Sequence, residues 1–271
     1  MTTQQEKAVR FRALHDEPRP FLIPNPWDAG TARLLAGLGF EALATTSLGV
    51  ANTLGRKRVD AEEVLDNCRA ICAATSLPVN ADLENGFADD PAAAATMIES
   101  AYAAGAVGAS IEDATGDRDA PIYDFGLAVE RVRAAVEVAR ALPVPFTFTA
   151  RAENLLHGVH DLDDTIARLQ AFEAAGADVL YAPGLRTLDE MRAVVSSVGR
   201  PVNVVMGFAD PTITLAQLAE IGVRRVSVGG ALNRLALRAF LDGARQLRDG
   251  SFEFVADLVP LADLHEAFGE S

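Results

Sequence analysis

A recurring run of helix, glycine and strand most strongly limits the folds open to this chain. Four times an amphipathic, alanine-rich stretch ends at a glycine and a short apolar run follows, at Gly39, Gly105, Gly176 and Gly222. Glycine at this place supplies the left-handed conformation that ends a helix before a tight turn. Strands that are apolar along their whole length are typical of a parallel sheet buried on both faces. The repeat therefore predicts alternating strands and helices.

Eight strand–helix units fit into the 271 residues. Eight such units in a chain of this length predict an α/β protein with a (β/α)8 TIM-type barrel, at about 20–250 of one domain covering 1–271. A doubly wound sheet is the alternative, but it needs a glycine-rich loop after the first strand, and this chain has Pro-Asn-Pro-Trp-Asp there. The expected strands are 21–25, 41–45, 79–82, 107–112, 146–150, 179–181, 202–205 and 225–228. The expected helices are 28–38, one capped by Asp60, one opened by Pro91, 126–140, 162–175, 188–198, 214–221 and 232–247.

An additional C-terminal helix is expected at about 252–268, where Phe252, Leu258, Leu261 and Phe268 recur at roughly helical spacing. A ring of eight units has no place for this helix, so its apolar face needs another surface. A neighbouring copy of the chain is the natural one, and we expect a homo-oligomer.

Composition narrows the class of partner and the compartment. The net charge is −14 and the pI is near 4.7, which argues against a nucleic-acid or membrane partner. Cys68 and Cys72 lie on one helix face, and we expect them to be apolar core residues rather than a disulfide framework. Together with a polar N-terminus that lacks an apolar signal core, this predicts a cytoplasmic protein.

Acidic residues follow two neighbouring strands, at the end where a barrel of this type keeps its active site. Asp82 and Glu84 close the third strand, and Glu112 closes the fourth. Acids two residues apart in a strand point the same way, so a cation is expected nearby. Carboxylate oxygens suit Mg²⁺, with Mn²⁺ as an alternative, so we assign Asp82, Glu84 and Glu112 as metal ligands. The other interpretation of Asp82–Gly86 is a solvated turn.

An arginine at the end of the fifth strand, Arg151, would hold a substrate carboxylate or an enolate oxygen. We assign Arg151 and Glu112 as the catalytic residues, against the alternative that the two only form a salt bridge at the barrel rim. Backbone amides after the second strand could cradle another anionic group. The expected substrate-binding residues are Thr46, Ser47, Leu48, Arg151, Asn203 and Tyr181.

Four motifs in register resemble those of the isocitrate lyase/phosphoenolpyruvate mutase superfamily. They are D-x-[DE]-x-G at 82–86, E-D at 112–113, A-R-x-[DE] at 150–153 and G-F-x-A at 39–42, which is followed by an anion loop at 46–47. The resemblance implies a Mg²⁺-bound 2-oxo carboxylate whose enolate form is stabilised. It also implies that Asp82 touches the metal directly and that Glu84 and Glu112 hold it through waters. Dimers that exchange a C-terminal helix, assembled as tetramers, are implied as well.

The chain departs from the superfamily at three places. The 114–119 loop lacks the Cys and His of the lyase motif K-[KR]-C-G-H, and Ala44 and Ala182 stand where the mutases carry an aromatic residue and a histidine. Tyr123 lies in the altered loop, either as a proton donor or as an anchor packed on the rim.

Three functions are therefore open. The first is a Mg²⁺-dependent lyase that cleaves a C–C bond of a 2-oxo or 2-hydroxy carboxylic acid, of the oxaloacetate decarboxylase or isocitrate lyase kind. The second is a phosphonomutase-type enzyme acting on a P–C bond, which the missing aromatic and histidine count against. The third is a non-catalytic 2-oxo acid binder, which the intact acids and Arg151 argue against.

Overall fold

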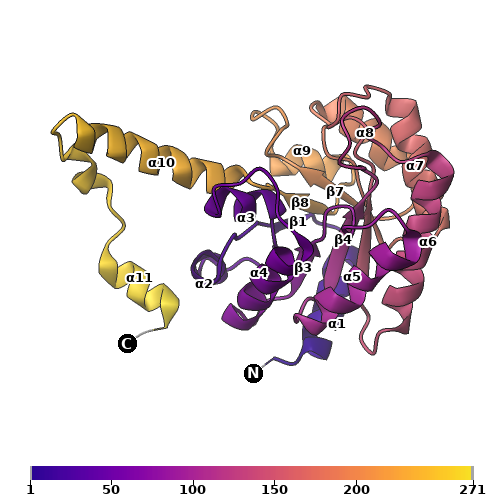
Figure 1. Cartoon of the computed structure of the whole chain (residues 1–271), viewed down its shortest axis with the longest axis horizontal. Helices are drawn as coiled ribbons and strands as arrows, with labels where there is room; N and C mark the ends of the chain where they lie inside the picture. The colour runs from indigo at the N-terminus through magenta and orange to yellow at the C-terminus, as the bar shows by residue number, and fades with distance from the viewer. Residues whose placement is uncertain (1, 270–271) are drawn as a thin grey trace.

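Eight parallel strands form the centre of the molecule in the computed structural model, which describes residues 2–269 (Figure 1). The strands pair in the order β1-β8-β7-β6-β5-β4-β3-β2. The Ala44 amide donates to the Pro24 carbonyl at 3.1 Å, so the end of β1 also meets β2. The result is a nearly closed TIM-type barrel, as predicted. The strands are β1 (Phe21–Ile23), β2 (Leu43–Ala44), β3 (Val79–Asp82), β4 (Gly108–Glu112), β5 (Thr147–Arg151), β6 (Val179–Tyr181), β7 (Val202–Val205) and β8 (Arg225–Ser227).

Helices alternate with the strands and cover the outside of the barrel (Figure 1). The barrel helices that the sequence predicts are all present, and where a range was predicted their ends differ from it by about one residue. Asp60 caps its helix reciprocally with Glu63, and Pro91 is the first residue of its helix, as expected. The predicted helices are α2 (Ala29–Gly37), α4 (Ala61–Ala74), α5 (Pro91–Ala103), α6 (Phe125–Ala141), α7 (Leu162–Ala174), α8 (Leu188–Ser197), α9 (Leu215–Glu220) and α10 (Ala231–Arg248).

The glycines of the repeat have the backbone conformation that the sequence predicts. Gly39, Gly105, Gly176 and Gly222 adopt φ of +84°, +103°, +104° and +89°. A residue with a Cβ rarely adopts such angles, so these positions favour glycine.

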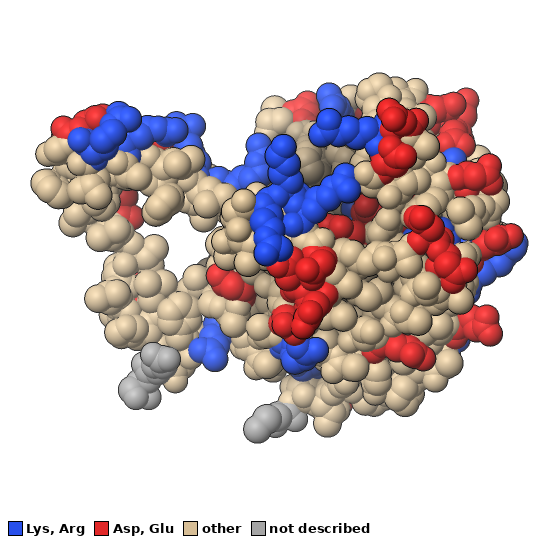
Figure 2. All heavy atoms as spheres, viewed as in Figure 1, with Lys and Arg blue, Asp and Glu red and all other residues tan. Residues whose placement is uncertain are grey.

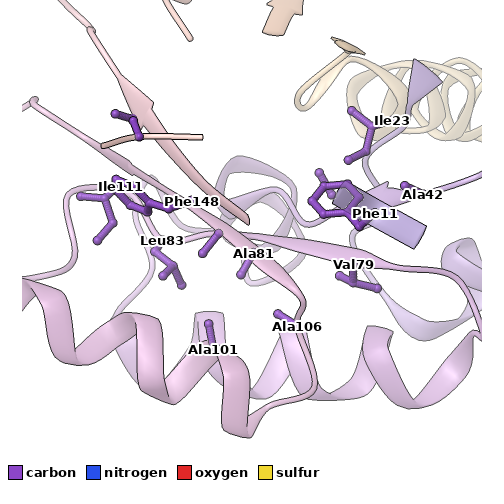
Figure 3. Packing of buried hydrophobic residues seen from close by; sticks show 14 of the residues in the cluster. Phe11, Ile23, Ala42, Val79, Ala81, Leu83, Ala101, Ala106, Ile111 and Phe148 are labelled. Atoms are coloured by element: carbon purple, nitrogen blue, oxygen red, sulfur yellow. The ribbon is translucent and has the colours of Figure 1, made fainter. Parts of the chain in front are cut away.

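Two helices were not expected. They are α1 (Gln4–Asp16), which lies in the polar N-terminal segment, and α3 (Ser47–Thr53), which follows β2. In α1, Phe11 is fully buried and packs edge-on against His15 and Phe21. Figure 3 shows Phe11 close to Ile23 among the core side chains. Because Phe21 begins β1, α1 packs against the N-terminal end of the barrel.

Cys68 and Cys72 are buried in α4 as free thiols, with their sulfur atoms 3.9 Å apart, which confirms their assignment to the core. No helix within residues 2–269 is both long enough and apolar enough to cross a membrane.

An additional C-terminal helix is present, as predicted, but it does not extend over the whole of 252–268. The segment forms a short 3-10 helix, η1 (Glu253–Asp257), and a separate helix, α11 (Leu261–Phe268). Pro260 lies at the break, where it offers no N–H to a continuing helix and biases the preceding residue toward an extended conformation. Figure 1 shows α10 extending away from the barrel. The chain then turns back and ends in α11.

Candidate functional site

A cavity of about 180 Å³ opens at the C-terminal ends of the strands. The site lies there because each strand delivers its last inward side chain to this end of the barrel. Asp82 is on the cavity wall, whereas Glu84 and Glu112 are not among the residues that line it. All the expected substrate-binding residues do line it: Thr46, Ser47, Leu48, Arg151, Asn203 and Tyr181.

Arg151 lies at the centre of an ion-pair cluster. Its Nη1 is 2.7 Å from Asp82 Oδ1, its Nη2 is 2.8 Å from Glu112 Oε2, and its Nε donates to Glu153 Oε1 at 2.8 Å. The guanidinium carbon also lies 5.1 Å from the centre of the Tyr181 ring. β4 and β5 pair Glu112 directly with Arg151, which explains why these two side chains meet. Glu112 and Arg151 thus form the salt bridge of the alternative interpretation. However, the same guanidinium also contacts Asp82 and Glu153, and Arg151 lines the cavity.

The start of α3 holds the other oxygen of Asp82. The Ser47 amide donates to Asp82 Oδ2 at 3.0 Å, and the Asp82 amide donates to the Thr45 hydroxyl at 2.8 Å. Thr46 caps α3 by accepting from the Gly49 amide. The expected anion loop is therefore the first turn of a helix, and in this structure its Ser47 amide is bonded to a carboxylate of the protein.

Glu84 does not occupy the place that the strand pattern predicts. β3 ends at Asp82, and Glu84 sits in the following turn with a φ of +47°, so the same-side argument for Asp82 and Glu84 is wrong. The Gly86 amide closes this turn on the Leu83 carbonyl at 2.8 Å. A non-glycine residue held at positive φ stores backbone strain, which is common at functional sites. Burial raises the pKa of Glu84 in this turn, and the negative charge of Asp82 raises it further.

Negative charge is in excess around Arg151. Asp82, Glu112 and Glu153 all contact this one guanidinium, and Glu84 lies in the turn that follows Asp82. Burial raises the pKa of Glu112 well above its ordinary value, and neighbouring carboxylates raise it further. Burial also raises the pKa of Glu153 to about 7, with the charge of Asp113 acting in the same direction. Burial lowers the pKa of Arg151, but the surrounding acids outweigh this and raise it well above its ordinary range.

This charge excess and the oxygen-only donors fit a hard divalent cation such as Mg²⁺. Within residues 2–269, no three His, Cys, Asp or Glu side chains converge on one point as a ready-made metal site. Arg151 instead binds both Asp82 and Glu112. Asp82, Glu84 and Glu112 therefore stay the predicted ligands, and a metal would share these carboxylates with Arg151.

Tyr123 has the geometry of an anchor. Its hydroxyl donates to Asp89 Oδ1 at 2.6 Å, and the Arg131 guanidinium lies 4.2 Å from its ring centre. Arg131 also donates to the backbone carbonyl of Asn85, which ties the turn after β3 to α6. Tyr123 is buried and does not line the cavity.

Among the residues on the cavity wall that were given no role from the sequence are Asn25 and Arg225. Asn25 Oδ1 accepts from the amides of Val228 and Gly229 at 3.1 and 2.8 Å, which ties the end of β8 to that of β1. Arg225 begins β8 and is buried. A charged residue at an inward position of an otherwise apolar strand is the signal that points to it.

The sequence matches known proteins over most of its length. A family model described as phosphoenolpyruvate phosphomutase matches residues 11–248. An uncharacterized protein of Mycobacterium tuberculosis is 31% identical over 94% of this chain and 95% of its own length. An oxaloacetate decarboxylase of Pseudomonas aeruginosa is 29% identical, over 91% of this chain and 87% of its own.

Solved structures give the same picture. A Burkholderia cenocepacia protein assigned only broadly, as a lyase/mutase, is 58% identical with a TM-score of 0.95, covering 98% of this chain and 96% of its own. An oxaloacetate acetylhydrolase with the product oxalate has a TM-score of 0.88 at 26% identity, covering 99% and 96%. A phosphonopyruvate hydrolase with oxalate and Mg²⁺ has a TM-score of 0.87 at 26% identity, covering 100% and 96%.

Proposed function

Because the chain belongs to the phosphoenolpyruvate phosphomutase family, we propose that it is a Mg²⁺-dependent lyase. It cleaves a C–C bond of a 2-oxo or 2-hydroxy carboxylic acid through an enolate. The observation that carries this proposal is the group of three acids, Asp82, Glu112 and Glu153, that contact Arg151 beside the cavity at the C-terminal mouth of the barrel. The likeness to an oxaloacetate decarboxylase and to an oxaloacetate acetylhydrolase supports it.

The residues divide the work by position. Asp82, Glu84 and Glu112 would hold Mg²⁺, which when bound draws electron density from the 2-oxo group of the substrate. Arg151 donates N–H groups from the cavity wall toward the oxygen on which negative charge grows. Glu112 and Glu153 fix the plane of the Arg151 guanidinium through their 2.8 Å contacts.

Oxaloacetate illustrates the electron balance. The bond between C3 and C4 breaks, CO₂ leaves, and the electron pair of the bond becomes the enolate of pyruvate. Arg151 stabilises that enolate oxygen, and a water molecule supplies the proton to C3. This route needs no dedicated acid, which suits a site whose loop at 114–119 lacks Cys and His. A larger acid that breaks by a retro-aldol step fits the same residues.

A phosphonate substrate is the second candidate, because the chain also resembles a phosphonopyruvate hydrolase. Two positions count against it. Ala44 lines the cavity where the mutases would have an aromatic side chain, and Ala182 is buried where they would have a histidine.

Turnover of a panel of 2-oxo and 2-hydroxy acids with Mg²⁺ tests the proposal. We expect release of a 2-oxo acid or CO₂ from at least one C–C substrate, with no activity from Asp82→Ala purified in the same way. Formation or loss of a P–C bond in ³¹P NMR would favour the phosphonate alternative. Saturable binding without turnover of any substrate would overturn the enzymatic assignment and leave a binding protein.

A cytoplasmic location belongs to the same proposal, since 2-oxo acids of this kind are small soluble metabolites.

A further inference from the structure

The wall of the cavity is polar one layer below the acids, where a barrel of this type normally packs bulky apolar side chains. Inward side chains recur every second residue along a strand, so the residues two positions before Asp82, Glu112 and Arg151 form this lower layer. β7 and β8 contribute to it as well. Its polar members that line the cavity are Asn80, Ser110, Asn203 and Arg225, and Thr149 is fully buried in contact with Arg225.

Arg225 carries the positive charge of this layer. Only 3% of the residue is exposed, and it lines the cavity. Its Nε donates to Asn203 Oδ1 at 2.9 Å, and its Nη2 donates to Thr149 Oγ1 at 3.1 Å. Its Nη1 lies 3.4 Å from His15 Nε2. Within residues 2–269 no acidic side chain forms a salt bridge with Arg225.

His15 does not change this charge. The Phe11 carbonyl lies 2.9 Å from His15 Nδ1 and can only accept, so Nδ1 carries the proton and Nε2 accepts from Arg225. Burial, with the charges of Arg225 and Arg12, lowers the pKa of His15 to about 3, so the ring is neutral near pH 7. Every group bonded to Arg225 is therefore uncharged.

The two arginines on the cavity wall thus differ in charge balance. Arg151 contacts three carboxylates, whereas no carboxylate within residues 2–269 forms a salt bridge with Arg225. A buried cation without a counter-charge is costly, and an apolar side chain would fill the barrel at less cost. Asn80 adds a second sign of an incomplete polar surface: it is buried on the same wall, and within residues 2–269 its Oδ1 has no hydrogen-bond partner.

We infer that Arg225 and Asn203, which line the cavity, form a second anion-binding subsite at its floor, with Thr149 holding the Arg225 guanidinium in place. It takes a carboxylate of the substrate remote from the 2-oxo group, and so selects dicarboxylates over monocarboxylates of the same length. The inference rests on the proposed function for the 2-oxo end of the substrate. The competing account is that Arg225 only ties α1 to the inside of the barrel through His15.

Binding of matched ligand pairs to the Mg²⁺-loaded protein separates these accounts without relying on turnover. Dissociation constants are measured for 2-oxobutyrate against oxaloacetate and for 2-oxopentanoate against 2-oxoglutarate, with oxaloacetate measured by rapid mixing. A charge-assisted hydrogen bond corresponds to about a 10- to 100-fold change in affinity. In the wild type we expect a preference of this size for the dicarboxylate in at least one pair. Arg225→Gln should abolish it, and Arg225→Lys should retain part of it.

Arg224→Gln is the matched control, because the neighbouring arginine instead donates to the Pro18 carbonyl at the surface. It should keep the full dicarboxylate preference. Equal affinities within both pairs in the wild type, or a preference that survives in Arg225→Gln, would overturn the inference and leave Arg225 as a structural tie. If Arg225→Gln does not fold, the wild-type pairs and Arg225→Lys decide. Failure of the wild type to bind even the monocarboxylates would instead overturn the proposed function, and the inference with it.

Discussion

Asp82 is shared between two neighbours in this structure, Arg151 Nη1 and the Ser47 amide. Asp82→Ala should abolish both Mg²⁺ binding and Mg²⁺-dependent activity, while the melting temperature changes little because one acid leaves a cluster with excess negative charge. Glu84→Ala should be milder, since a ligand that acts through water contributes less than a direct one, with losses of about 10- to 100-fold typical of outer-shell groups. Calorimetric Mg²⁺ titration and thermal melting measure the two effects. Asp66→Ala on the exposed face of α4 is the control, and equal metal affinity in wild type and Asp82→Ala would refute the assignment.

The substitution Arg151→Lys keeps the positive charge at this position but removes the planar guanidinium. Arg151→Lys cannot reach Asp82, Glu112 and Glu153 together, so it should lower kcat/KM by about two to three orders of magnitude, mostly in kcat. Arg140→Lys, which alters a surface pair with Asp178, should leave the kinetics unchanged. A structural role alone would lower the melting temperature and leave kinetics per folded molecule near normal. Both quantities should be measured on one preparation.

Helix α1 makes the stability of the protein depend on pH, because it buries His15 against Arg225. Burial lowers the pKa of His15 from 6.5 to about 3. Below pH 6.5 the unfolded chain binds a proton that the folded protein does not, so this contribution to stability falls as pH falls from 6.5 toward 3, by at most about 1.4 kcal/mol per pH unit. The His15→Gln variant lacks this contribution. Its free energy of unfolding, taken relative to that of the wild type, should therefore be higher at pH 5 than at pH 7, and urea unfolding at both pH values measures it. His160→Gln changes an exposed histidine, and its free energy of unfolding should depend on pH as that of the wild type does. The same pH dependence in His15→Gln and the wild type would refute this role of His15.

The whole chain presents apolar surface that its own barrel does not cover. Charged side chains line one edge of α10, and uncharged ones cover the edge toward α11 (Figure 2). Leu235 and Phe240 of α10 are 66% and 70% exposed, and an apolar groove of about 490 Å³ lies between α2 and α10. Burial of such surface against a second copy is worth about 25 cal/mol per Å².

We therefore predict a homotetramer, or a dimer that exchanges its C-terminal segment. Sedimentation at micromolar concentration should show the oligomer for the wild type. Phe240→Glu should shift it toward smaller species, whereas Val9→Glu, at an exposed apolar position on α1, should not. A wild-type monomer under these conditions would contradict the prediction.

The sequence by itself determined the strands, most helices and their ends, because these depend on contacts within a few residues. The left-handed glycines, the Asp60 cap and the first-turn Pro91 are all of this kind. It also placed Asp82, Glu112 and Arg151 at one end of the barrel, because parallel strands deliver their ends to the same side.

Only the tertiary structure decided how these side chains share their charges. The meeting of Asp82 with Arg151, and of Arg225 with His15, joins residues that lie 69 and 210 positions apart. Such contacts depend on strand register and on how α1 packs against the barrel, which no local pattern encodes. The same holds for the turn that carries Glu84 and for the uncompensated charge of Arg225, because a charge is balanced by its neighbours in space and not by those in sequence.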